Sequence, residues 1–254
     1  MSWQDVALKW EKFEDLEDYL KTQLENFSEK EKEEAFYAPL EFGTAGMRGI
    51  VGPGINRMNV YTVRQATEGL ARLIETYGEE AKKRGVAIAH DSRHFSPEFA
   101  LESAKVLVKH GIKAYVFEDL RPTPELSYAV RHLHTFAGIM ITASHNPAAY
   151  NGYKVYGEDG GQMPPKDADA LTEFVRQVEN PLAVDVVTKE ELEQSALFEW
   201  IGEAVDASYL EEIKSVSVNS ALLSNTKDLS VVYTPLHGTG LMLTKRALDQ
   251  AGFT

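Results

Sequence analysis

Cysteine is absent from the 254 residues of this chain, which excludes disulfides and thiolate metal sites. Long apolar runs are absent as well: nothing approaches 18 consecutive apolar residues, so no membrane span is expected. The segment from Met1 to Trp10 lacks the basic and then apolar pattern of a signal peptide. From these absences we expect a cytoplasmic protein with no membrane partner.

Basic residues are scarce relative to acidic ones. The chain has 26 Lys and Arg against 39 Asp and Glu, a formal net charge of -13, and no run rich in Lys or Arg. Because a negative surface repels polyanions, we expect no nucleic-acid partner. A small anionic substrate remains compatible with this charge, because a few Arg, Lys and backbone N–H groups can form a positive pocket within a negative surface.

Regular apolar periodicity is what the sequence does contain. Residues 3–37 place apolar side chains at helical spacing among acids and lysines. Within this region Ser28 and Glu31 form a capping box at the start of a second helical run. We expect residues 1–40 to be an N-terminal helical extension that packs on the outside of the domain that follows.

Residues 41–200 alternate between short apolar strands and amphipathic helices. The glycines within 43–54 indicate a loop or a strand pair, and Asn59 is expected to cap a helix that runs to about Tyr77. Ser96-Pro97-Glu98 and Thr123-Pro124-Glu125 each have the pattern of an N-cap, a first helical residue and an acidic first turn. Apolar strands are expected at 86–89, 114–117 and 136–141. This order predicts an α/β fold: a layered α/β/α domain with a mixed, largely parallel sheet.

The later part of the chain gives weaker patterns. We expect a turn at Asn151-Gly152, a strand over 153–156, a helix over 165–178 and an irregular connection over 180–200. Residues 201–254 are then expected to begin a second, similar α/β domain with a helix near 206–216, a strand at 229–233 and a helix at 241–251. One strand cannot close a core, so this second domain is expected to be incomplete and to be followed by further domains of a longer protein.

The segment from Gly138 to Lys154 holds the residues best suited to chemistry. Ligands gather beyond the carboxyl ends of strands in parallel α/β sheets, and Ser144 stands three residues past an apolar strand. Its hydroxyl could serve as a nucleophile, with His145 or Lys154 moving protons or stabilising negative charge. The residues alone are also compatible with a structural role for all three. Ser144 could cap a turn, His145 could be structural, and Lys154 could be a solvated charge.

Several motifs occur together and in a characteristic order. Thr142-Ala143-Ser144-His145-Asn146-Pro147 is followed by Asn151-Gly152 and Lys154, and it resembles the phosphoserine loop of the α-D-phosphohexomutases, the phosphoglucomutase and phosphomannomutase family. The supporting motifs are Glu41–Gly49, Asp91-Ser92-Arg93, Arg121–Leu126 and Pro235–Gly240. With its long helical N-terminus, the chain is most similar to the N-terminal portion of the bacterial phosphoglucomutase branch, which also contains phosphopentomutase-type members.

The resemblance implies a role for each matching residue. Ser144 would carry the phosphoryl group, His145 would order the loop and contact substrate, and Lys154 would be the general acid or base. Arg48 would lie near the phosphoserine, and Thr44, Arg48, Asn146 and Lys154 would bind substrate or phosphate. Transfer of a phosphoryl group spreads negative charge over its oxygens, so such a site needs positive charge and positioning more than covalent assistance. Asp91 and Arg93 are expected to form an ion pair that fixes a loop, Arg121 to be a similar brace, and His237 to lie in a strand-to-helix turn.

The function implied is intramolecular transfer of a phosphoryl group between hexose 1-phosphate and 6-phosphate, with glucose 1,6-bisphosphate as intermediate or activator. The family's Mg²⁺ would be bound by Ser144 through its phosphate and by an Asp-x-Asp-x-Asp-Arg loop that this sequence lacks. We therefore expect the chain alone to be an incompetent mutase. Phosphomannomutase or phosphopentomutase activity, and a non-catalytic module that only binds sugar phosphate, are the alternatives.

Overall fold

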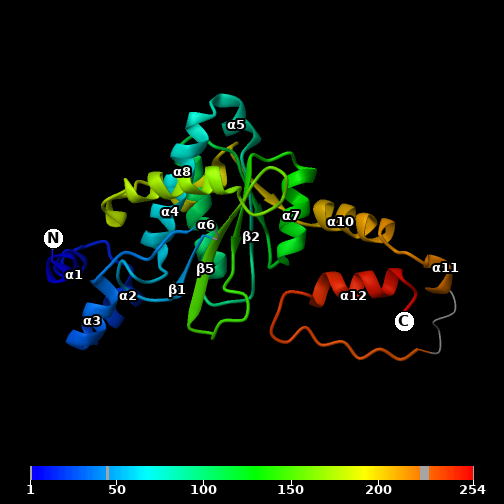
Figure 1. Cartoon of the computed structure of the whole chain (residues 1–254), viewed down its shortest axis with the longest axis horizontal. Helices are drawn as coiled ribbons and strands as arrows, with labels where there is room; N and C mark the ends of the chain where they lie inside the picture. The colour runs from blue at the N-terminus through cyan, green and yellow to red at the C-terminus, as the bar shows by residue number, and fades with distance from the viewer. Residues whose placement is uncertain (1, 44–45, 224–228, 254) are drawn as a thin grey trace.

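A six-stranded sheet forms the centre of the computed structural model, which describes residues 2–43, 46–223 and 229–253 (Figure 1). The strand order is β1-β5-β4-β2-β3-β6. β2 pairs in parallel with β3 and β4, and β3 pairs in parallel with β6, whereas β5 runs antiparallel to both β4 and β1. The strands are β1 (Met47–Ile50), β2 (Val86–His90), β3 (Ala114–Phe117), β4 (Ala137–Ile141), β5 (Tyr150–Tyr156) and β6 (Phe198–Ile201). The predicted mixed, largely parallel sheet is confirmed.

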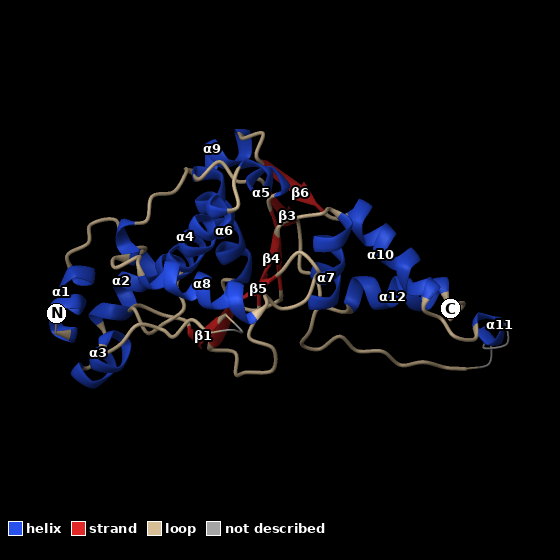
Figure 2. Ribbon diagram, turned by 45° about the horizontal axis from the view of Figure 1, so that its top comes forward, coloured by secondary structure: helices blue, strands red, loops and turns tan. Residues whose placement is uncertain are grey.

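Helices cover both faces of this sheet (Figures 1 and 2). The helices α4 (Val60–Thr76), α6 (Ser96–Lys109) and α8 (Pro165–Arg176) lie on one face, and α7 (Thr123–His132) with the start of α10 (Glu203–Ser215) lies on the other. Along β2, Val86 and Ile88 belong to the first core cluster, and Ala87 and Ala89 belong to the second. Burial on both faces explains the uninterrupted apolar strands and confirms the layered α/β/α class.

The N-terminal region forms three helices, α1 (Trp3–Glu11), α2 (Asp18–Glu25) and α3 (Glu29–Phe36), at one end of the molecule (Figure 1). The Trp10 ring packs edge-on against Tyr61 of α4 with ring centroids 5.5 Å apart. Trp10, Leu20 and Leu24 are buried in the same cluster as the α4 face of the sheet. This region therefore shares the main core rather than only covering the outside of the domain.

Two of the predicted helix caps are confirmed and two are wrong. Asn59 accepts hydrogen bonds from the backbone N–H groups of Tyr61 and Thr62, and Ser28 closes its capping box with Glu31. Phe95 and Pro122, rather than Ser96 and Thr123, are the caps of α6 and α7. Ser96 takes the first helical position because its hydroxyl donates instead to Asp91, at 2.8 Å.

Three predictions in the later part of the chain are also wrong. Asn151 and Gly152 lie inside β5 rather than in a turn, because β1 supplies the strand with which they pair. The expected connection over 180–200 contains η1 (Pro181–Ala183), α9 (Lys189–Gln194) and the first three residues of β6. Residues 229–233 form no strand: Val232 is 98% exposed, and no neighbouring strand lies beside this segment in the described part of the chain. The remaining helices are α5 (Glu79–Arg84), α11 (Ser220–Leu223) and α12 (Leu241–Gln250), and in the described ranges no helix has the length and apolar character to cross a bilayer.

A buried charge cluster joins α7 to α10 and α12. The Arg121 guanidinium, 1% exposed, donates to both carboxylate oxygens of Asp206, at 2.8 and 2.9 Å, which confirms the expected bracing role of Arg121. Arg246 of α12 donates to both oxygens of Glu203 and lies 3.6 Å from Asp206. Burial acts to raise the pKa of Asp206, but hydrogen bonding from Arg121 and Glu125, together with the positive charges of Arg121 and Arg246, outweighs it and holds that pKa below its usual value.

Glu125 lies in this cluster with its side chain fully buried. Burial, together with the adjacent Asp206 carboxylate, raises the pKa of Glu125 to about 8. A carboxyl with a raised folded-state pKa adds stability that is complete below its unfolded pKa. That stability is lost as the pH rises through the folded pKa.

We therefore expect the free energy of unfolding to fall between about pH 4.5 and pH 8, by at most about 1.4 kcal/mol per pH unit from this group. Glu125→Gln stays neutral and is expected to remove that slope, so that the variant unfolds at a higher urea concentration than the parent at pH 8.5. Urea titrations at pH 5, 7 and 8.5 measure this. Parallel pH profiles for the two proteins would show that Glu125 is ionised throughout.

Candidate active site

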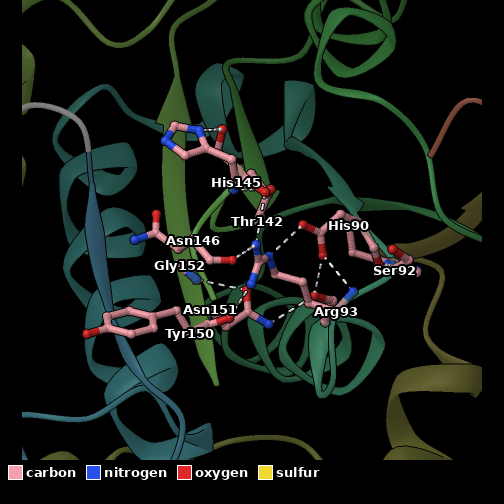
Figure 3. Close-up of polar contacts among 12 residues, drawn as sticks. His90, Ser92, Arg93, Thr142, His145, Asn146, Tyr150, Asn151 and Gly152 are labelled. Atoms are coloured by element: carbon pink, nitrogen blue, oxygen red, sulfur yellow. Dashed lines mark hydrogen bonds and ion pairs between the residues drawn. The ribbon is translucent and has the colours of Figure 1, made fainter. Parts of the chain in front are cut away.

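The loop that joins β4 to β5 carries Ser144 at the surface of the molecule. Ser144 is exposed and adopts a left-handed backbone conformation with φ of 55°. Its backbone N–H donates to the Thr142 hydroxyl at 3.1 Å, and its Oγ lies 3.2 Å from Nδ1 of His145 (Figure 3). This conformation costs a non-glycine residue on the order of 1–3 kcal/mol, and such residues concentrate at functional sites.

Ser144 opens onto a cleft of about 420 Å³. The cleft lies beyond the carboxyl ends of β2 and β4, which are neighbouring parallel strands, and this is where ligands bind in such sheets. The segment 237–239 before α12 lines the other side, where the Ser92 hydroxyl donates to the His237 carbonyl at 3.2 Å. The sheet side of the cleft includes Asp91, Arg93, His94, Thr142, Ser144 and Asn146.

Arg48 lies next to the Ser144 loop. It stands on β1 opposite Gly152 of β5, and its Nη1 donates to Oδ1 of Asn146 at 2.7 Å. A β-carbon on Gly152 would lie 2.6 Å from the Thr142 carbonyl, so the absence of a side chain there lets β5 approach the base of the loop. The structure therefore brings Arg48 into contact with Asn146, which lies two residues after Ser144 in the same loop.

Lys154 lies near the Ser144 loop on the same sheet but does not line the cleft. It is half-buried on β5 and pairs with Met140 of β4, so the two side chains share a sheet face with Arg48. Met140 lines the cleft, whereas Lys154 does not, and the Lys154 side chain makes no hydrogen bond or ion pair with the residues that the structure describes. Thr44, also predicted as a phosphate-binding residue, lies outside the described residues.

Arg93 is the residue whose contribution was underestimated from the sequence. The expected ion pair with Asp91 is present, with Nε 3.5 Å from Oδ2. Arg93 also donates to several carbonyls of the Ser144 loop, contacts that could not be foreseen from the order of residues (Figure 3). The available signal was that Arg93 and Ser144 each follow an apolar strand, but the adjacency of β2 and β4 was needed to connect them.

No group of three or more His, Asp or Glu side chains is arranged to hold a metal ion within residues 2–43, 46–223 and 229–253. Mg²⁺ prefers several oxygen ligands in an octahedral arrangement. A phosphate on Ser144 would supply only part of such a set, so the described residues do not fit a complete magnesium site.

Comparisons with known proteins agree with this architecture. Residues 39–181 match the family model of the phosphoglucomutase/phosphomannomutase α/β/α domain I. A phosphoglucomutase from Staphylococcus saprophyticus is 38% identical over 238 residues, which cover 94% of this chain and 41% of the relative. A phosphoglucomutase from Staphylococcus aureus (strain USA300) is 38% identical over 229 residues, which cover 90% of this chain and 40% of the relative.

Solved structures give the same result. A Thermus thermophilus protein provisionally named a phosphomannomutase superposes with a TM-score of 0.64 at 28% identity, over 85% of this chain and 44% of its own. The phosphoglucomutase parafusin from Paramecium, at 17% identity and a TM-score of 0.62 over 85% of this chain and 42% of its own, supports the fold alone. The chain spans about two fifths of the length of the curated relatives it matches. By its sequence match and its fold, the chain belongs to the phosphoglucomutase/phosphomannomutase family and contains that family's α/β/α domain I.

Proposed function

We propose that this chain supplies the phosphoserine domain of a phosphoglucomutase-like intramolecular phosphotransferase, with Ser144 as the residue that carries the phosphoryl group. The observation that carries the proposal is the placement of Ser144. Its hydroxyl is exposed, its backbone is left-handed, and it opens onto a cleft at the carboxyl ends of two parallel strands. Within a family domain of this type, that placement suits a group that must meet a substrate rather than stabilise a turn.

The proposed chemistry has two matching half-reactions. A hydroxyl of the sugar phosphate attacks the phosphorus on Ser144, the bond from phosphorus to Oγ breaks, and a bisphosphate forms. The proton leaves the attacking hydroxyl and is restored on Oγ. In the second half-reaction Oγ gives up its proton and attacks the other phosphoryl group of the bisphosphate, and the bond from that phosphorus to the sugar oxygen breaks. The sugar oxygen takes up a proton, phosphoserine is regenerated, and the isomeric sugar phosphate is released. Holding the attacking oxygen in line with phosphorus can remove about 7–11 kcal/mol of the barrier.

The neighbouring residues are assigned roles by position. His145, with Nδ1 3.2 Å from Oγ, is the group placed to exchange a proton with the serine. Arg48 places its positive charge beside Asn146 on the same loop and would stabilise phosphoryl oxygens. Lys154 is proposed as the acid or base toward the sugar hydroxyl, which it would reach from the sheet face it shares with Met140. Thr44 is proposed as a further phosphate contact.

Glucose is the proposed sugar because the relatives at 38% identity are named phosphoglucomutases. Hexose 1- and 6-phosphates would be the substrates, and glucose 1,6-bisphosphate the intermediate. The required Mg²⁺ would take one contact from the phosphate on Ser144 and the rest from residues beyond those described. The proposal includes a cytoplasmic location and cooperation with the remaining domains found in the longer relatives.

Mapping the phosphoryl group tests this proposal. The complete gene product is incubated with glucose 1,6-bisphosphate and Mg²⁺, and its peptides are analysed by mass spectrometry. One phosphoryl group on Ser144 is expected, and none on Ser92, which lines the same cleft but lacks the left-handed conformation. Phosphate on another serine, or on none, contradicts the assignment. A parallel incubation with mannose 1,6-bisphosphate reports which sugar is preferred.

A further inference from the structure

The Arg93 guanidinium is enclosed by carbonyl groups of the Ser144 loop (Figure 3). Its Nη2 donates to the carbonyl oxygens of Ser144 and Asn146, at 2.9 and 2.6 Å. Its Nη1 donates to those of Pro147 and Tyr150, both at 2.9 Å. A single side chain therefore fixes the backbone of residues 144–150 at four points.

The guanidinium is itself held in place from behind. Asp91 lies beside Nε, and the exposed fractions of the Arg93 and Asp91 side chains are only 13% and 12%. The Ser96 hydroxyl donates to the other oxygen of Asp91, and the buried Asn151 amide donates to the Ser96 hydroxyl at 2.9 Å. This chain of contacts leads from β5 through α6 to Arg93, so the orientation of the guanidinium is determined by the fold.

Only arginine can make this set of contacts. A guanidinium has five N–H donors in a rigid plane, and here the four terminal ones each meet a different carbonyl while the fifth lies toward Asp91. A lysine ammonium has three donors at a single point and would leave carbonyls of the loop without partners.

The hydrogen bond from Arg93 to the Ser144 carbonyl acts on a residue whose backbone is in the strained left-handed conformation. The N–H of Ser144 is fixed by Thr142, and its carbonyl is fixed by Arg93, so the peptide groups on both sides of its left-handed Cα are held. Without the second contact, Ser144 would be free to relax toward the conformations that non-glycine residues prefer. Such a rotation would carry Oγ away from its present direction.

We propose that Arg93 is a positioning residue that holds Ser144 in its left-handed conformation and so directs Oγ into the cleft. This inference rests on the proposed function for its catalytic consequence. The structural part, that Arg93 orders residues 144–150, stands independently and can be measured without any substrate.

Arg93→Lys tests the proposal, with Arg84→Lys as a matched control. Arg84 also donates to two backbone carbonyls, those of His134 and Thr135, and to a carboxylate, but away from the cleft. Amide hydrogen exchange of the Asn146 and Tyr150 N–H groups, which bond to carbonyls within the loop, is expected to accelerate about tenfold in Arg93→Lys. Exchange in β4 should stay unchanged in both variants, and loop exchange should stay unchanged in Arg84→Lys.

The same variants separate positioning from substrate binding. In the complete gene product, kcat is expected to fall about 10²-fold in Arg93→Lys with KM little changed, because the nucleophile is misplaced while the sugar contacts remain. If Arg93→Lys does not fold, Arg93→Gln supplies a smaller neutral side chain, and the same exchange increase is expected from it.

Loop exchange equal to that of the parent would overturn the positioning role. A second outcome is that Arg93→Lys loosens the loop while the parent protein never accepts phosphate on Ser144. That result would overturn the proposed function and leave Arg93 as the residue that orders the loop. A loosened loop with normal kcat would likewise overturn the catalytic consequence drawn here.

Discussion

Ser144→Ala is expected to lower the rate of phosphoryl exchange between sugar positions on the order of 10⁴-fold or more, because it removes the oxygen that would accept and donate the group. The fold should be unaffected. The Ser144 side chain is exposed, and alanine keeps the same β-carbon at the strained position. Unfolding free energy is expected to change by less than about 0.5 kcal/mol, as is usual for surface positions.

A coupled assay of glucose 1-phosphate conversion by the complete gene product measures this effect. Ser215→Ala is the control, because Ser215 is an exposed serine on α10 whose hydroxyl bonds only within its own helix. A Ser144→Ala enzyme with more than roughly a tenth of the parental rate would rule out Ser144 as the phosphoryl carrier. The chain would then be better described as a sugar-phosphate-binding module.

Asp206→Ala is expected to reduce the free energy of unfolding by about 3–5 kcal/mol, the cost of leaving a buried charge without its partner. Arg121 loses both of its short contacts with Asp206, and Glu125, whose Oε2 lies 3.7 Å from Nε, makes no hydrogen bond with Arg121 that would replace them. Water cannot easily compensate, because the Arg121 side chain is almost fully buried. The predicted loss is a large fraction of the stability of an ordinary domain.

Equilibrium unfolding in urea, followed by circular dichroism, measures the loss. Glu203→Ala is the matched control: its carboxylate also receives two hydrogen bonds from an arginine, Arg246, but its side chain is 73% exposed, so a change of about 0–1 kcal/mol is expected. Equal effects of the two variants would mean that Arg121 is hydrated in solution and that burial does not set the strength of the Asp206 contact.

Much of the fold could be predicted because local patterns and tertiary structure agree there. The strands at 86–89 and 114–117 are continuous apolar runs, and the structure buries them on both faces. The turn expected at Asn151-Gly152 failed because that dipeptide also fits a strand when a glycine is needed for close packing, and β1 was not foreseen as its partner. Residues 229–233 have the composition of a strand, but a strand forms only beside another strand.

In the candidate site, too, the sequence predicted what depends on local patterns and missed what depends on tertiary contacts. Ser144 could be found because the position of a polar residue after an apolar strand is visible along the chain. The function of Arg93 could not, since its partners are backbone carbonyls that come close only through the order of strands in the sheet. Every residue has a backbone carbonyl, so a sequence does not indicate which carbonyls an arginine will contact. Asp91, in contrast, lies two positions before Arg93 and was predicted as its partner.

The antiparallel pairing of β4 and β5 makes the Ser144 loop intolerant of changes in length. Both of its ends are fixed in one ladder, with Met140 opposite Lys154 and Ile141 opposite Tyr153. Deleting a single loop residue would draw β5 along by one position, and since side chains alternate between faces, Lys154 would turn toward α4 and Tyr153 toward the sheet face of Arg48 and Met140. An amine would then be forced into the apolar interior while a phenol was placed beside Arg48 at the base of the loop, so both folding and chemistry would be impaired by one lost amino acid.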